Sequence, residues 1–429
     1  MASSSNGKKG LAVGLQYSAA DIARLRNGQE LPAQARHGNG AVRHLLTLKQ
    51  TNALYRAESD ATAKRVAVCV VVLLVLVFFS LCPMGAAGEY YPYASRYAFY
   101  TPWEVAQCLY MHAYNAIAES THLFEPHSKT WLLANVPGYW AIPHRAGVVG
   151  ITLVCAVLLA TAGMLYQNVF KNPIAGPGML GVGSGVSLGM MLLVYLNGAA
   201  APAMITQRYL YCYGFGAAIL IFVIIAGRKL SGKGKPFDIV TMLLIGSILS
   251  QLLGFIVSYV TLFVMSEEDY LTFYNLSQML TVDTSLVSWM SLGFAATISL
   301  LPIYLLRYKM NGLALDDVEA RLMGLSLTKL RGISLVCGAI MILAAQVHTG
   351  MVGLVSLLVP FLSRSTFGCE FSKQFTGNVC LGTILLLICR DITDMIPFVG
   401  EGIAISSVVS VVLMPLFVLV MAKSLRGWE

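Results

Sequence analysis

The side chains whose types could do chemistry are few, and their spacing does not build a catalytic site. Charged residues make up only 12% of the 429 residues. Within the apolar stretches, the cluster of ionisable residues is Arg390, Asp391 and Asp394. The sequence holds no HExxH motif and no Ser/His/Asp array. We therefore predict no catalytic residue, which disfavours a membrane-embedded enzyme.

The Arg390 cluster bears on a second class of protein, the secondary transporter driven by ions. Such a transporter needs ionisable residues within its membrane spans as a relay. The first six apolar stretches contain almost none, and the Arg390 cluster is expected near the outer end of a later span. An ion-driven transporter is therefore the less favoured alternative.

Histidines and cysteines could bind a metal, but their spacing does not fit a metal site. The sequence has nine cysteines and no CxxC pair, which disfavours a zinc or redox centre. Four histidines share one segment without the spacing of metal ligands: His112, His122, His127 and His144. We predict no metal and no cofactor. Cys82 and Cys108 could pair if both face outside, or they could simply pack among apolar side chains.

A glycine- and lysine-rich stretch, residues 227–234, nearly matches a phosphate-binding P-loop. Its last position requires Ser or Thr to hold Mg²⁺, and Gly234 stands there. A P-loop also follows a strand, whereas this stretch follows an apolar run. We interpret it as a basic loop, so any work driven by ATP would need a separate subunit.

The composition predicts an all-α polytopic membrane protein. Apolar residues make up 57% of the chain, and charged residues are about half as frequent as the roughly 25% of a soluble domain. Apolar stretches near 20 residues recur, which is the length that crosses a bilayer. The first of them begins at Val66, so no cleavable signal peptide is expected. We predict about ten transmembrane helices, at 66–84, 146–168, 178–197, 207–227, 239–264, 286–306, 332–349, 351–364, 378–394 and 403–423.

The distribution of charge orients these spans. Lys64 and Arg65 precede the first span, and basic residues follow the second, fourth, sixth, eighth and tenth. The opposite side carries Glu267, Glu268 and Asp269. Because cytoplasmic loops carry an excess of Lys and Arg, both termini are predicted to lie in the cytoplasm.

Four segments follow from this topology. Residues 1–65 form a basic cytoplasmic arm whose role the sequence does not indicate, and 66–429 form the transmembrane domain. Residues 311–331 form a cytoplasmic segment. The extracytoplasmic segment 85–144 is rich in Tyr and Trp, which suits the bilayer interface. A docking surface for an extracellular binding protein is the alternative role for this aromatic segment.

Small residues favour close helix packing in the third span. Gly181, Gly185 and Gly189 recur at every fourth position. Such faces let helices approach closely in lipid, where no hydrophobic force drives them together. We expect these three glycines to pack against neighbouring helices.

The stretch 163–185 carries a longer motif. It resembles the signature Q-x-x-x-x-N-P-L-A-x-P-x-x-L-G-x-x-x-G of the FecCD-type permease subunits of ABC importers for iron-siderophores, haem and vitamin B12. The matching residues are Gln167, Asn172, Pro173, Ala175, Pro177, Leu180, Gly181 and Gly185.

The resemblance implies the type II ABC importer permease fold and a multi-pass protein of the cytoplasmic membrane of a prokaryote. It implies a homodimer, two ABC ATPase subunits inside and a substrate-binding protein outside. The cargo would be an iron chelate, siderophore or haem, with cobalamin or another corrinoid as the alternative. The sequence does not indicate which of these is carried.

Within the first motif, the resemblance places a cytoplasmic gate at Asn172, Pro173 and Ile174. Proline fixes φ and asparagine bonds local backbone groups, so this loop should be stiff.

A second motif follows the sixth span and resembles the family's ATPase-coupling segment, N-x-L-A-L-G-[DE]-x-x-A-R-x-L-G. The coupling residues carried over are Leu315, Asp317, Ala320, Arg321 and Gly324, while Asp316 and Met323 depart from the pattern.

The residue types of this second motif predict a short exposed helix over 314–325. Acidic residues stand at its positive N-terminal end, and Gly324 can end it as a left-handed cap. Asp317 and Arg321 are spaced to pair on one face. The apolar residues Leu315, Val318 and Leu322 could enter a groove of the partner.

The match is looser elsewhere. Gly350, Pro360, Arg364 and Asp391 fit the family pattern. Departures from it are Ser356 for Gly, Phe361 for His and Met395 for Arg. Arg145 fits loosely and is expected to anchor a span end at the interface. The resemblance covers about residues 140–423.

Overall fold

The structure is a computed structural model that describes residues 40–82, 101–121, 127–128, 131–132, 135–136, 139, 141–172, 175–230, 239–277, 283–314, 317–350, 352–395 and 405–426. The chain divides into two compact units, Met1–Val68 and Cys69–Glu429. In the first unit the described residues belong to helix α3 (Gly40–Phe79), which continues beyond the unit boundary. The basic arm predicted from the sequence is thus helical from residue 40 onward.

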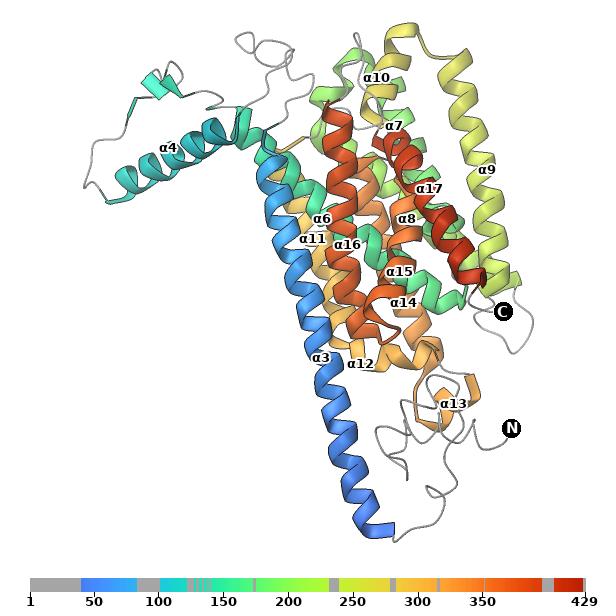
Figure 1. Ribbon diagram of the computed structural model, residues 1–429. Coiled ribbons are helices and arrows are strands. Elements are labelled where there is room, and N and C mark those ends of the chain that lie inside the picture. Colours follow the sequence, from blue (N-terminus) through green and yellow to red (C-terminus); the bar gives the residue numbers. More distant parts are fainter. Residues whose placement is uncertain are drawn as a thin grey trace. The chain divides into compact units, whose positions relative to one another are not determined.

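The second unit is all-helical in its described part, as the composition predicts (Figure 1). After α3 its elements are α4 (Pro102–Thr121), α6 (Ala141–Phe170), η3 (Pro177–Leu180), α7 (Val182–Asn197), η4 (Gly198–Ala203), α8 (Ile205–Leu230), α9 (Ile239–Phe263), α10 (Glu267–Ser277), α11 (Leu286–Leu305), α12 (Arg307–Met310), η5 (Asn311–Ala314), α13 (Asp317–Leu322), α14 (Leu327–Thr349), α15 (Gly353–Phe367), α16 (Phe371–Met395) and α17 (Ile405–Arg426).

Eight helices of the described residues are long and apolar enough to cross a membrane. Two further apolar helices, Gly353–Phe367 and Ile405–Leu419, are shorter. Each of the ten predicted spans overlaps one of these ten helices. Predicted and observed boundaries differ at α3, which begins at Gly40 rather than near Val66. They also differ at α16, which begins at Phe371 rather than near Asn378, because Lys373 and Gln374 make its first turns polar.

Helices α6 and α14 form the centre of the bundle. Their most apolar windows are 78% and 72% buried, against 17% for α9. Small residues let neighbours approach α6 closely. A Cβ on Gly382 of α16 would lie 2.9 Å from the Cβ of Ala160 and 3.3 Å from the carbonyl of Ala156. This is the close backbone packing that association in lipid requires.

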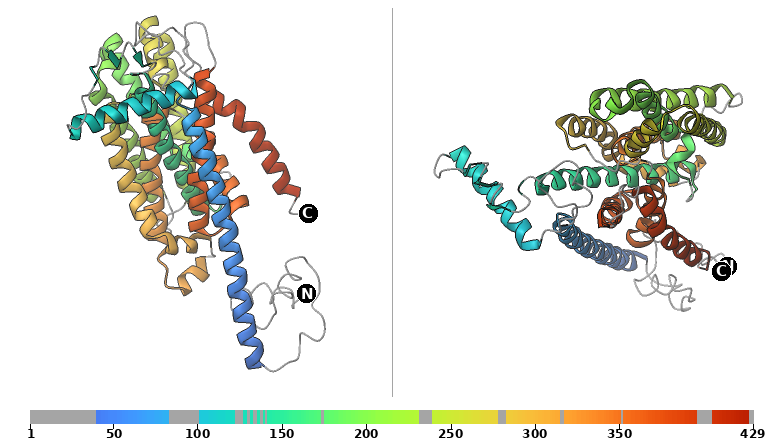
Figure 2. Two further views of the ribbon diagram at one scale, coloured as in Figure 1. Left: turned by 60° about the vertical axis from the view of Figure 1, so that its left-hand side comes forward. Right: turned by 90° about the horizontal axis from the view of Figure 1, so that it is seen from above.

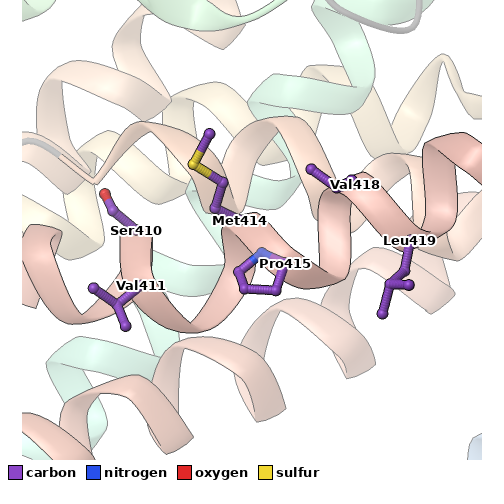
Figure 3. A pocket seen from close by; sticks show the side chains of 6 residues that line it. All are labelled: Ser410, Val411, Met414, Pro415, Val418 and Leu419. Carbon is purple, nitrogen blue, oxygen red and sulfur yellow. The ribbon is translucent and has the colours of Figure 1, made fainter.

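The bundle has two ends, which Figures 1 and 2 show from three sides. At the "α4 end" lie α4 and α10, the start of α6 and the end of α16. At the "α13 end" lie α12, η5 and α13, with the joint between α6 and α7. Long helices run between the two ends in alternating directions, so residues far apart in sequence meet at each end.

Candidate functional site

The α13 end contains the joint that carries the first motif. The last turn of α6 is tied to α15 by two side-chain bonds. Gln167 Nε2 donates to the carbonyl of Leu357 at 2.9 Å, and Arg364 donates to Asn168 Oδ1 at 3.0 Å. Gln167 is 1% exposed, so its bond to a backbone carbonyl lies inside the bundle. The matched Gln167 and Arg364 therefore hold one helix joint together.

The loop after α6 contains the residues predicted as a gate. The amide of Asn172 donates to the carbonyl of Gln167 at 3.3 Å, and the amide of Ala175 donates to the carbonyl of Asn172 at 3.1 Å. These bonds frame a tight turn around Asn172. The other two predicted gate residues, Pro173 and Ile174, lie outside the described residues.

The three glycines predicted to pack do so in two ways. A Cβ on Gly185 would lie 2.9 Å from the Cα of Gly216, and one on Gly189 would lie 2.6 Å from the carbonyl of Tyr211. Both therefore sit where α7 crosses α8. Gly181 is not part of that helix face. It precedes α7 as its N-cap with φ +74°, because the turn from η3 needs a left-handed residue. A Cβ on Gly181 would lie 3.1 Å from the carbonyl of Gly246 in α9.

The coupling segment forms η5 and the six-residue α13, shorter than the predicted helix over 314–325. Gly324 has φ +76°, the left-handed conformation expected of it. The amide of Leu325 donates to the carbonyl of Ala320 at 3.0 Å, the bond that closes a Schellman cap. The local sequence thus ends this helix as predicted.

The coupling segment has an anchored side and an exposed side. The backbone amide of Phe371 donates to Asn311 Oδ1 at 2.8 Å, so the segment binds the start of α16. Ala320 is fully buried, whereas Leu322 and Met323 are 83% and 69% exposed. An exposed apolar tip on an anchored helix is typical of a surface that binds a partner.

Some predicted coupling residues lie beyond what the structure describes. Leu315 lies outside the described residues, as do the side chains of Asp317, Val318 and Arg321. The pairing of Asp317 with Arg321 therefore stays a prediction.

The α4 end contains a charge cluster formed by α6 and α16. Arg145 forms ion pairs with Asp394 and, at 3.1 Å, with Asp391. Arg390 also binds Asp394, at 3.0 Å. Ser80 donates through Oγ to Asp391 at 2.6 Å and accepts from Arg145 Nε at 2.8 Å through its carbonyl.

This cluster corrects the expectation for Arg145. Arg145 is only 5% exposed, so it is an internal ion-pair partner rather than an interface anchor. Sequence reasoning identified the Arg390 group but missed its partner, since Arg145 and Asp391 are 246 positions apart. Both carboxylates are bound by arginine and the cluster has no net charge. This arrangement is typical of a structural network rather than of an ion relay.

A second polar network lies at the same end, between α8 and α11. Arg208 binds Asp283 at 3.3 Å, and Asp283 accepts a 2.6 Å hydrogen bond from Ser288. Tyr209 shares a 2.5 Å bond with Ser288. Burial would raise the pKa of Asp283, but the hydrogen bonds from Ser288 and Ser285 and the charge of Arg208 together lower it.

Three of the four histidines considered as metal ligands, His112, His127 and His144, lie in the described residues. In the described part of the chain, no group of three or more His, Cys, Asp or Glu side chains could hold a metal ion. His144 contacts Thr284 Oγ1 at 3.1 Å and thereby lies between the two polar networks. His112 stacks on Tyr139, and His127 stacks on Trp131. His122 lies outside the described residues.

Cys82 and Cys108 are both thiols in the structure rather than partners in a disulfide. The Cys82 thiol contacts the carbonyl of Phe78 at 3.9 Å, and Cys108 contacts His112 Nδ1 at 3.5 Å. Burial raises the pKa of the Cys108 thiol to about 11. Both cysteines thus pack as apolar side chains, the second of the two expectations.

Taken together, the helical bundle, its apolar spans and the anchored coupling segment at the α13 end define a multi-pass membrane transport protein. The sequence model of the FecCD transport family matches residues 139–423, and the chain belongs to that family. The match starts and ends close to the limits of the predicted resemblance. The chain is therefore a permease subunit of an ABC importer.

Two relatives illustrate the similarity. The probable iron chelatin transport system permease protein of Helicobacter pylori (strain ATCC 700392 / 26695) is 26% identical over 243 residues, covering 56% of this chain and 69% of the relative. The hemin transport system permease protein HmuU of Yersinia pestis is 29% identical over 244 residues, covering 55% and 70%.

A solved structure shows the same fold. It is a metal-chelate type ABC transporter in an inward-facing conformation, with a TM-score of 0.57 at 21% identity. The alignment covers 75% of this chain and 99% of that chain. The predicted fold class is thus confirmed.

Proposed function

We propose that this permease subunit carries an iron chelate, a ferric siderophore or haem, across the cytoplasmic membrane of a prokaryote. Relatives that share its family move such cargo according to their names, which supports the proposal. In this scheme the α13 end faces the cytoplasm and binds two ABC ATPase subunits. The α4 end receives cargo from an extracytoplasmic binding protein, and two copies of the chain form the pathway.

The observation that carries this proposal is the build of the coupling segment. Helix α13 is fixed on its inner side by the buried Ala320 and presents Leu322 and Met323 outward. The segment continues into α14, and Asn311 at its start accepts a hydrogen bond from Phe371 at the start of α16. A partner that pushes α13 would therefore transmit force to the core of the bundle.

The charges support this orientation. Lys229 and Lys329 are exposed at the α13 end, whereas Glu267 and Glu268 are exposed at the α4 end. Basic residues favour the cytoplasmic side. An even number of spans then places both termini inside.

The test uses the tagged full-length chain in cells, with copurification of an ABC ATPase and uptake of labelled ferric siderophore, haem and cobalamin. Arg321→Glu reverses a charge on α13 and should abolish uptake and ATPase binding while membrane levels stay normal. Lys229→Glu is the matched control, because it reverses an exposed charge at the same end but outside the coupling segment. Wild-type uptake in Arg321→Glu would exclude the coupling role.

Gly324 offers a second pair of variants. No atom lies within 4 Å of a Cβ placed there, so only the backbone conformation opposes a side chain. Valine disfavours positive φ, whereas asparagine accepts it more readily. Gly324→Val should lose transport and Gly324→Asn should retain most of it.

The uptake measurements with the wild-type chain test the cargo separately. If cells take up cobalamin but neither ferric siderophore nor haem, the chain is an importer permease but the iron-chelate proposal is wrong.

A further inference from the structure

Helix α4 lies outside the part of the chain that matches the family. It runs across the bundle axis and projects sideways from the bundle, whereas the spans run along the axis (Figures 1 and 2). Its N-terminus has a capping box: Glu104 accepts from the amide of Thr101 at 2.7 Å, and Thr101 Oγ1 accepts from the amide of Glu104 at 3.3 Å. Helix α4 therefore has a well-defined start of its own.

The inner face of α4 packs on the ends of the spans. Val105, Cys108 and Ala118 are fully buried. Val105 and Cys108 share one apolar cluster with Leu81, after α3, and Ile142, in α6. Helix α4 is thus held at the level where these spans end.

A side-chain bond also ties α4 to the segment that follows it. Asn115 Nδ2 donates to the carbonyl of His127 at 3.1 Å, and the amide of His127 donates to Asn115 Oδ1 at 3.1 Å. His127 in turn stacks between Tyr114 and Trp131. The inner face of α4 is therefore in contact with other parts of the protein.

The outer face of α4 is apolar where a helix in water would be polar. Trp103, Tyr110 and Ile117 recur every seventh residue and are 78%, 64% and 53% exposed. Leu109 is 42% exposed beside them, and alanines fill the positions between. The helix contains no Lys or Arg. Its two acidic residues stand near the helix ends: Glu104 forms the N-terminal cap, and Glu119 lies in the last turn.

We propose that α4 lies flat in the interfacial layer of the bilayer, with Trp103, Tyr110 and Ile117 immersed in lipid. Three observations favour lipid over a protein partner. The helix lies at the level of the span ends, it projects away from the bundle, and its exposed rings are Trp and Tyr, which concentrate at membrane interfaces. Helix α3 also exposes apolar side chains, with Leu74 and Phe79 65% and 54% exposed.

The chemistry of the face specifies the kind of lipid contact. A basic interfacial helix depends on Lys and Arg contacts with anionic headgroups, but α4 has no Lys or Arg. The insertion of α4 into the bilayer should therefore depend only on the burial of its apolar side chains. The depth of α4 should be the same in zwitterionic and in anionic bilayers.

The test is spin labelling of the full-length permease in liposomes. Cys69, Cys82 and Cys369, the cysteines of the described part that are not buried, are first replaced by Ser. Single cysteines then replace Tyr110 and Glu119, and each label is exposed to oxygen and to a water-soluble nickel chelate. The label at position 110 should favour oxygen at least several-fold, whereas the label at 119, on the exposed last turn, should favour nickel.

Two results would overturn the lipid assignment. The first is equal access of nickel to positions 110 and 119, which would place the outer face of α4 in water. The second is a label at 110 that nickel reaches in the liposome alone but not after an extracytoplasmic binding protein is added. That result would make the face a protein docking surface. An Ile117→Cys label serves as the second reporter if the label at 110 disturbs folding.

Discussion

The backbone carbonyl of Ser356 in α15 occupies the space into which a side chain on Gly163 of α6 would project. The two helices therefore touch backbone to backbone at the centre of the bundle. Gly163 stands at the start of the first motif, and Ser356 stands where the family pattern has glycine. The α6–α15 crossing keeps its close approach because one of the two residues is still glycine.

Substitution of Gly163 should accordingly disrupt packing. Gly163→Ala places a methyl group against a backbone carbonyl that cannot move alone, so overpacking of about 1–3 kcal/mol or more is expected. The control is Gly293→Ala in α11, where no atom lies within 4 Å of the added Cβ. Thermal unfolding in detergent should show a clear drop in Tm for Gly163→Ala and none for Gly293→Ala. Equal Tm values would mean that α6 and α15 are further apart than described.

The charge cluster at the α4 end gives a second prediction. Arg145→Gln leaves Asp391 with only Ser80 and Asp394 with only Arg390. Removing one partner of a buried ion pair typically costs about 3–5 kcal/mol. We expect a strongly lowered Tm and reduced membrane levels for this variant.

The partly exposed ion pair of Glu370 and Lys373, whose charged atoms are 3.3 Å apart, provides the matched control for that cluster. Surface pairs contribute about 0–1 kcal/mol, so Glu370→Gln should leave Tm nearly unchanged. The double variant Arg145→Gln, Asp391→Asn should recover part of the loss, because it removes the carboxylate that Arg145→Gln leaves without an arginine. No recovery would argue that Arg145 acts through packing rather than charge.

The lowered pKa of Asp283 predicts an acid-sensitive contribution to stability. A carboxylate whose pKa is lower in the folded than in the unfolded protein stabilises the fold above its unfolded pKa, about 4. This contribution is lost as the pH falls through the folded pKa. Asp283→Asn should therefore lower Tm at pH 7 and flatten the further loss of Tm at acid pH. Parallel curves for variant and wild type below pH 5 would contradict this.

The sequence predicted the features that local chemistry decides. Span lengths follow from the thickness of the bilayer, and the left-handed Gly324 follows from a helix that must end before the next one starts. The sequence did not predict contacts between segments that are far apart in the chain. The partner of Asp391 is Arg145, 246 positions away, and a single sequence carries no signal for that pairing.

Two further differences have local causes. Gly181 shares the four-residue spacing of Gly185 and Gly189, yet it lies before α7 because η3 enters the helix through a left-handed turn. The aromatic composition of segment 85–144 did not predict helix α4, since aromatic residues are indifferent helix formers.

The last prediction concerns the orientation of the two bundle ends in the membrane. Lys229 is exposed at the end of α8, at the α13 end, and Glu268 is exposed in α10, at the α4 end. With Cys69, Cys82 and Cys369 replaced by Ser, Lys229→Cys should react in intact cells only with a membrane-permeant maleimide. Glu268→Cys should also react with an impermeant one, because the acidic α10 lies on the side that lacks the basic loops. Inverted membrane vesicles should exchange the two patterns. If the impermeant reagent labels both positions in intact cells, the two ends cannot lie on opposite sides of the membrane. If it labels Lys229→Cys alone, the α13 end faces outward and cannot bind a cytoplasmic ATPase.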